Sequence, residues 1–287
     1  MNKVTFYKII LIFLLNLSSY SAYEASIYLS SGSKLFSENI TIFNNKLIYD
    51  QSKNPISLDY IERVEFKFKN FNNDICSSLF KRNKLVALES LLEELKILSK
   101  FSKIESNLPL YFNWLLKSQI WNNNYSEALE SIKYLKDTNS KSNYLIAELY
   151  LIYILLEKNE IDDAYNKFKE VKISDDELIK PMYNYLKARV CFNKKQYSLA
   201  LSYLANVVAY YSHNSEWMAP TLLLEAETYL FIKKREKAFN IVQEIKWIYP
   251  NSYWSNKADA LLEYWFNKRN YYEKLLCLLV KYYYFCL

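Results

Sequence analysis

The sequence predicts a mainly α-helical fold, an α-solenoid of about five helical hairpins that follows a small antiparallel β-unit. The first observation is a repeat: Ala128, Ala164, Ala200 and Ala238 succeed one another at intervals of 36, 36 and 38 residues. A fixed period of this size is typical of stacked helical hairpins, because no single hairpin can bury its apolar face alone. The second observation is a change of pattern, since residues 25–68 alternate as strands do and later residues follow a helical period.

The β-unit is predicted from two short runs and an alternating segment. Residues 40–43 and 46–49 flank Asn44 and Asn45, and asparagine tolerates the positive φ that a two-residue hairpin turn requires. Residues 61–68 alternate apolar with charged side chains, which is the pattern of a half-buried strand. A sheet this small is marginal alone, so we expect it to pack on the first helices.

Residues 70–108 are expected to form a linker and divergent leading helices. Six leucines there fall at three- and four-residue steps on one helical face: Leu85, Leu88, Leu91, Leu92, Leu95 and Leu98. Ala87 lies 41 residues before Ala128, which favours a leading repeat. The repeats themselves are expected over residues 109–287, as the helix pairs 109–121 with 124–137, 142–157 with 160–171, 178–192 with 196–211, 217–232 with 234–248, and 253–267 with 270–285.

The apolar segment 275–285 resembles a membrane tail, but the repeat register extends into it. Lys274 lies 36 residues after Ala238 and occupies the alanine position of the same phrase. The apolar run is far shorter than the ~20 residues needed to cross a bilayer. We therefore interpret the segment as a degenerate terminal repeat, and a peripheral membrane contact through this C-terminal helix stays open.

The alanines are expected where the two helices of a hairpin cross. Ala188 and Ala226 lie 12 residues before Ala200 and Ala238, which places a second small residue on the facing helix. Aromatic neighbours then fill the space around each crossing, and a proline follows the last complete unit: Tyr125, Tyr197, Tyr229 and Pro250.

This pattern resembles the tetratricopeptide repeat (TPR) family, in which small residues lie 12 apart with an aromatic residue three before the second. The resemblance implies a right-handed solenoid whose first helices line a concave face that docks a peptide or protein partner. Candidates on those helices are Asn184, Tyr185, Arg189 and Glu225.

Residues 200–262 are also similar to exported bacterial TPR proteins of the Tol-Pal coordinator and outer-membrane assembly types. The shared feature is an inter-repeat turn, here Tyr249, Pro250, Asn251 and Ser252. The resemblance implies a protein partner in the bacterial cell envelope. No cysteine lies near the expected processing site, so a lipoprotein anchor is not expected.

Residues 1–22 are interpreted as a signal peptide. Lys3 and Lys8 give a positive start, residues 9–15 are apolar, and cleavage is expected after Ser21 or Ala22. The protein is therefore expected to be exported to the periplasm or the outer cell envelope. Retention of the segment as an uncleaved anchor is the alternative.

Composition argues against most enzyme classes. One glycine, Gly32, and one histidine, His213, cannot supply phosphate-binding loops, nucleophile elbows or histidine-rich metal sites. His213 is expected to be solvated, and Asp162, Asp163, Asp175 and Asp176 are expected to begin helices. We therefore expect no enzyme activity, no cofactor, no metal and no small-molecule substrate.

The charge pattern argues against nucleic-acid binding, and the cysteine spacing argues against a metal or redox motif. The net charge is +6, but the basic residues are interspersed with acidic ones, so nucleic-acid binding is not expected. The cysteines are expected to be buried free thiols, because their spacing contains no C-x-x-C motif: Cys76, Cys191, Cys277 and Cys286.

The sequence thus predicts an exported, non-enzymatic scaffold that docks a peptide or protein. The alternative is a glycan-binding helical-repeat protein of the cell surface, in which tryptophans form a sugar-stacking platform. The six tryptophans are Trp114, Trp121, Trp217, Trp247, Trp254 and Trp265.

Overall fold

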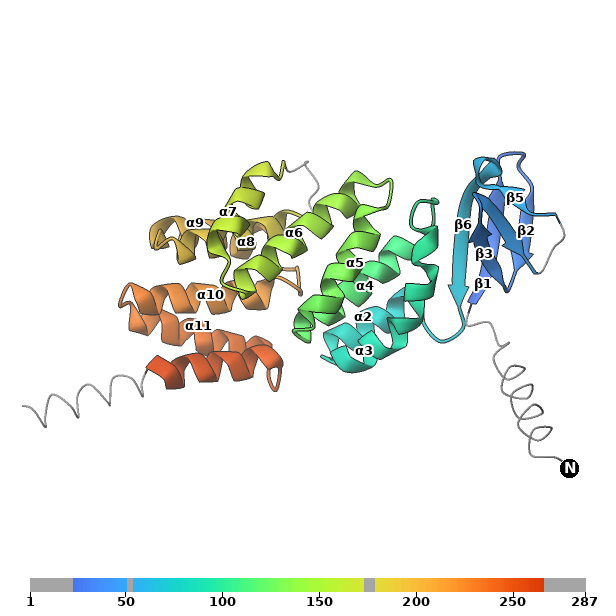
Figure 1. Ribbon diagram of the computed structural model, residues 1–287. Helices are drawn as coiled ribbons and strands as arrows, with labels where there is room; N and C mark the ends of the chain where they lie inside the picture. Colours follow the sequence, from blue (N-terminus) through green and yellow to red (C-terminus); the bar gives the residue numbers. More distant parts are fainter. Residues whose placement is uncertain (1–22, 51–53, 173–178, 266–287) are drawn as a thin grey trace, which may run out of the picture. The chain divides into compact units, whose positions relative to one another are not determined.

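The structure is a computed structural model that describes residues 23–50, 54–172 and 179–265 (Figure 1). It divides into two compact units, Met1–Ala147 and Glu148–Leu287, with the division inside helix α6 (Lys141–Glu157). The expected signal peptide over 1–22 and the expected last helix over 270–285 lie outside the described residues, as do Asp175, Asp176, Cys277 and Cys286.

The N-terminal β-unit contains two three-stranded antiparallel sheets, ordered β2-β1-β6 and β3-β4-β5. Their strands are β1 (Tyr23–Leu29), β2 (Lys34–Ser37), β3 (Ile40–Phe43), β4 (Lys46–Tyr49), β5 (Ile56–Ser57) and β6 (Ile61–Phe68). Strands β3 and β4 form the predicted hairpin, with Ile40 opposite Tyr49, and Asn44 and Asn45 adopt φ values of 48° and 59°. The sequence pattern missed β1, β2 and β5.

The β-unit packs on the helices that follow it within the first unit. The backbone N–H of Val64 in β6 donates to the carbonyl of Glu105 at 2.8 Å, and Val64 forms an isolated parallel bridge with Ser106. Phe68 at the end of β6 stacks on Phe71, with ring centroids 4.3 Å apart, and meets Tyr111 edge-on at 5.0 Å. The sheet and the first hairpins therefore share one apolar core.

The rest of the described chain is helical and arranged in hairpins, so the predicted fold class, mainly α and TPR-like after a small β-unit, is confirmed. The helices in addition to α6 are α2 (Asn73–Lys81), α3 (Leu85–Leu92), the 3₁₀ helix η2 (Glu93–Phe101), α4 (Leu108–Trp121), α5 (Tyr125–Lys136), α7 (Ile161–Glu170), α8 (Lys180–Asn193), α9 (Tyr197–Tyr210), α10 (Met218–Phe231) and α11 (Arg235–Ile248). Residues 253–265 form a further helix, the first half of the expected last pair.

Each hairpin closes with the same backbone turn. One residue takes a left-handed conformation, with φ between 55° and 63°, and the next N–H bonds back to the carbonyl five residues earlier, as Asn124 does to Gln119 at 2.8 Å. This is the Schellman arrangement that ends a helix. The left-handed residues are Asn83, Asn123, Asn159, Lys195 and Lys233.

The turn fixes which residue lies at the helix crossing. Ala128, Ala164, Ala200 and Ala238 each follow their turn residue by five positions and are 0% exposed. In the leading hairpin the same position is Leu88, also 0% exposed, whereas Ala87 is exposed. Ala87 is therefore not the counterpart of Ala128, although its helix α3 is the second helix of a leading hairpin, as expected. The helix also ends at Leu92 and continues as η2 rather than running on through Leu98.

Candidate functional site

The first helices of the hairpins in the second unit bring together charged and aromatic side chains far apart in sequence. We call Tyr153, Glu157, Tyr185, Arg189 and Glu227, with the underlying Trp217, the Arg189 cluster. Helix α6 supplies the first two, α8 the next two, α10 supplies Glu227, and Trp217 immediately precedes α10. The cluster thus draws its side chains from three helices that are separated in sequence.

An ion pair lies at the centre of the cluster. The Arg189 guanidinium contacts the Glu157 carboxylate, and the two side chains are 17% and 29% exposed. The same guanidinium lies over the ring of Tyr153 at 5.3 Å and that of Tyr185 at 6.0 Å. Arginine stacks in this way because its planar charge is attracted to ring faces. The pair is therefore held in place from two helices and remains open to solvent on one side.

Trp217 forms the floor of the cluster. It is 3% exposed, and its ring centroid lies 5.3 Å from that of Tyr185 and 6.3 Å from that of Tyr153. The side-chain oxygen of Asn214 accepts from the backbone N–H of Trp217 at 3.1 Å, which fixes the start of α10. The two tyrosine rings of the cluster thus pack on a buried indole.

A second polar contact lies beside Trp217. The Tyr150 hydroxyl donates to Glu216 Oε1 at 2.6 Å, and the Tyr150 ring lies 6.2 Å from that of Trp217. Burial and the Glu216 carboxylate raise the pKa of Tyr150 well above its ordinary value. Tyr150 therefore stays protonated and donates this bond.

Burial and neighbouring charges shift the pKa values of the ionisable groups in the cluster. Burial raises the pKa of Glu227, and the nearby Arg189 charge opposes that effect only in part. Burial raises the pKa of Tyr185 to about 12. Burial alone would lower the pKa of Arg189, but the adjacent Tyr185 and Glu157 raise it. The cluster thus holds the Arg189 cation in an ion pair with Glu157, and the same charge acts on Glu227.

The sequence-derived candidates divide between two faces of the array. Tyr185 and Arg189 meet in the Arg189 cluster. Glu225 does not, since its electrostatic neighbours Glu244 and Lys237 lie on α11. Asn184 is half-buried on α8. The sequence pattern missed Glu157, Trp217 and Glu227, because their proximity depends on contacts between helices.

The repeat positions lie in the core or beside the turns. Ala188 and Ala226 are 0% exposed, like the alanines they face. Tyr125 donates to Asn123 Oδ1 at 2.9 Å, and the Tyr197 ring stacks on Phe231 at 5.7 Å. Tyr229 is half-buried, and Pro250 is exposed in the turn after α11.

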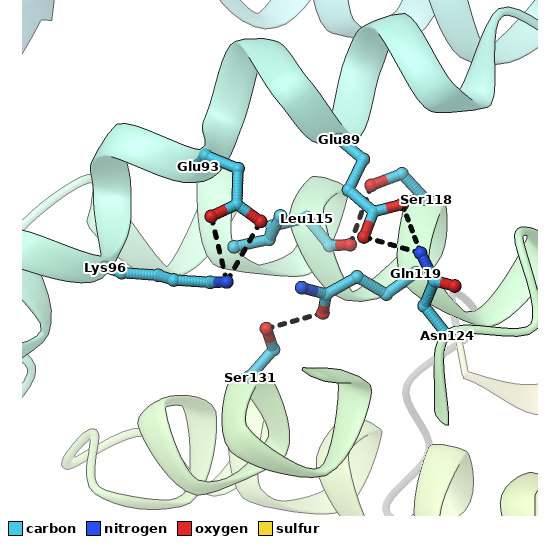
Figure 2. Close-up of polar contacts among 8 residues, drawn as sticks. All are labelled: Glu89, Glu93, Lys96, Leu115, Ser118, Gln119, Asn124 and Ser131. Carbon is cyan, nitrogen blue, oxygen red and sulfur yellow. Dashed lines mark hydrogen bonds and ion pairs between the residues drawn. The ribbon is translucent and has the colours of Figure 1, made fainter. Parts of the chain in front are cut away.

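A second polar cluster, in the first unit, joins α3 to the hairpin of α4 and α5 (Figure 2). Glu89, only 9% exposed, accepts hydrogen bonds from the side-chain amides of Asn122 and Asn124. Nearby, the Ser131 hydroxyl donates to Gln119 Oε1 at 2.7 Å, while Gln119 Nε2 is buried without a hydrogen-bond partner. Both oxygens of Glu89 are already bonded within the protein, so this carboxylate ties the helices together.

Within the described ranges, no three His, Cys, Asp or Glu side chains are placed to hold a metal ion. His213 is exposed in the turn between α9 and α10, and Asp162 and Asp163 lie in the first turn of α7. Cys76 and Cys191 are buried free thiols, as predicted. Among the helices that the structure describes, none is long and apolar enough to cross a membrane.

The tryptophans differ greatly in exposure. Trp247 on α11 is 84% exposed, whereas Trp217 is buried and the other four are half-buried. A stacking platform needs several exposed rings on one surface. The tryptophans therefore do not form one shared platform.

No protein-family model matches the chain, and no curated protein matches its sequence. Among solved structures, the chain is similar to YrrB, described as a TPR protein with an unusual peptide-binding site, at 16% sequence identity and a TM-score of 0.33. The match covers 65% of this chain and 89% of that chain. The fold class therefore rests on the helical hairpins themselves.

Proposed function

We propose that the protein is a non-enzymatic scaffold that docks a segment of a protein partner on the Arg189 cluster. The observation that carries the proposal is the cluster itself: an ion pair flanked by two tyrosine rings, on the first helices of successive hairpins. Clustered aromatic residues and arginine are enriched at the energetic centres of protein interfaces. A purely structural array has no need of a partly exposed charge pair at this place.

Site-specific photocrosslinking in the native host tests this proposal. A photoreactive residue replaces Asn184, which is half-buried on α8 and immediately precedes Tyr185. The control position is Ala205, exposed on the outer side of α9. We expect a discrete protein adduct from position 184, lost when Arg189→Ala is added, and none from position 205. Equal labelling from both positions would contradict the proposal.

We also propose export to the bacterial cell envelope, with cleavage after Ser21 or Ala22. The support is the charged, apolar and small-residue order of residues 1–22. Intact-mass measurement of the protein purified from its host tests it. A mature chain that begins at Ala22 or Tyr23 is expected, and a full-length chain would favour an uncleaved anchor.

Glycan binding is kept as the second candidate because Trp247 is 84% exposed. A sugar ring stacked on this indole would change its fluorescence, and Trp247→Ala would abolish that change. If oligosaccharides alter the fluorescence of the wild-type protein and not of W247A, this candidate gains over the scaffold. No change in either protein removes it.

A further inference from the structure

The charge in the Arg189 cluster is unevenly paired. Arg189 makes its ion pair with Glu157 and is stacked between Tyr153 and Tyr185, so its position is set by α6 and α8. Glu227 on α10 lies near enough for the Arg189 charge to oppose in part the effect of burial, which raises the pKa of Glu227. Within the described part of the chain, the Glu227 carboxylate has neither an ion pair nor a hydrogen bond. Glu227 is thus a half-buried carboxylate that lies near a cation but forms no direct bond with it.

The net charge of the Arg189 cluster is negative, whereas the net charge of the whole chain is positive. Two carboxylates, Glu157 and Glu227, accompany one guanidinium, and Glu216 lies beside the floor residue Trp217. The full chain carries a net charge of +6. A local acidic surface on a basic protein selects partners by charge at short range, since distant charges are screened within about 10 Å at ordinary salt.

We infer that the docked segment is basic, and that one of its arginine or lysine side chains pairs with Glu227 beside the ring of Tyr185. The inference rests on the proposed function and names the chemistry of the partner. The incoming cation completes the pairing of Glu227, and its aliphatic stem covers the aromatic residues above Trp217. A cation at this position also gains because the site is partly desolvated, which strengthens charged hydrogen bonds.

Three labelled peptides of about 12 residues test the inference by fluorescence anisotropy with the full chain. The three peptides have the same apolar residues at every second position. The positions between them hold arginine in the first peptide, glutamate in the second and glutamine in the third. Non-specific attraction to a chain of charge +6 favours the glutamate peptide, so a preference for arginine opposes the overall field. We expect the arginine peptide to bind at least about tenfold more tightly than the other two, which corresponds to one charge-assisted bond.

Matched variants locate the contact. Glu227→Gln is expected to weaken arginine-peptide binding about tenfold, in line with the loss of one charged hydrogen bond. Glu236→Gln, an exposed carboxylate in the first turn of α11, is the control and is expected to leave binding unchanged. Circular dichroism establishes that both variants fold.

The outcomes separate this inference from the proposed function. Equal binding of the arginine and glutamine peptides, or no effect of E227Q, overturns the basic preference while docking at the cluster stands. Absence of binding by all three peptides also overturns the inference. Crosslinking from position 184 then tests independently whether a partner docks on the Arg189 cluster.

Discussion

The side-chain amide of Asn107 forms two hydrogen bonds with the backbone of Phe66: its Oδ1 accepts from the N–H at 2.9 Å, and its Nδ2 donates to the carbonyl at 2.8 Å. Phe66 lies on the outer edge of β6, so one side chain replaces the neighbouring strand that this edge lacks. Asn107 also precedes α4, but its side chain does not cap that helix. It therefore joins the β-unit to the start of the hairpin of α4 and α5.

Replacement Asn107→Ala is expected to destabilise the first unit by about 2–3 kcal/mol, because both backbone groups of Phe66 become unsatisfied at a buried position. Urea unfolding measures the loss, and hydrogen exchange should show faster exchange of the Phe66 amide. Asn139→Ala is the control, since Asn139 makes only one exposed bond, to the Lys103 carbonyl at 3.3 Å. Equal effects of the two substitutions would show that the Phe66 contact has no special importance.

The helix crossings lead to a second prediction, for the second unit. Ala200 is 0% exposed where α9 meets α8, so Ala200→Leu is expected to destabilise by about 1–3 kcal/mol through overpacking. Ala205 lies on the exposed side of the same helix, and A205L changes no packed contact. Thermal unfolding of the two variants provides the comparison. If A205L lowers the melting temperature as much as A200L, the crossing at Ala200 is not tightly packed.

The sequence predicted the parts of the fold that local pattern determines. The alanine period located the hairpins, because the same phrase recurs along the chain, and Asn44 and Asn45 located a β-turn, because the turn depends on adjacent residues. The register assigned to the leading hairpin from Ala87 was off by one residue. Sequence spacing alone cannot show that Leu88 takes the crossing position. The left-handed turns were also missed, because asparagine and lysine occupy positions where glycine is the usual signal.

The candidate site was predicted only in part. Tyr185 and Arg189 follow from their place on a first helix, where the family resemblance puts binding residues. Their partners Glu157 and Glu227 lie 32 residues before Arg189 and 38 after it, on other helices. No local spacing indicates such a contact. Only the packed arrangement of the hairpins brings these charges together.

The lysines in left-handed turns give a third prediction. Lys233 adopts φ 63°, a conformation that costs a side-chain-bearing residue roughly 1 kcal/mol and glycine almost nothing. Lys233→Gly is therefore expected to stabilise the second unit by up to about 1 kcal/mol. Lys237→Gly, inside α11, should instead destabilise it by a similar amount. Chemical denaturation compares the two, and a destabilised K233G would mean that the lysine side chain makes a contact that outweighs the backbone strain.

The fourth prediction concerns pH. Burial, and then repulsion from Glu244, raise the pKa of Glu225, with Lys237 acting in the opposite direction. A carboxyl whose pKa is raised on folding binds its proton more tightly in the native state than in the unfolded chain. The destabilising contribution of Glu225 to folding is therefore absent at pH values below its ordinary pKa. This contribution develops as the pH rises through the raised pKa of the native state.

Glu225→Gln should accordingly make the second unit more stable than wild type at about pH 7, and the difference should vanish near pH 4, where the unfolded carboxyl also takes up its proton. Glu244→Gln removes the repulsion and should reproduce part of the gain. Glu236→Gln, an exposed carboxylate for comparison, should change little at either pH. Denaturant midpoints measured across this pH range decide the matter. A gain for E225Q that persists unchanged at low pH would show that it comes from packing and not from the charge of Glu225.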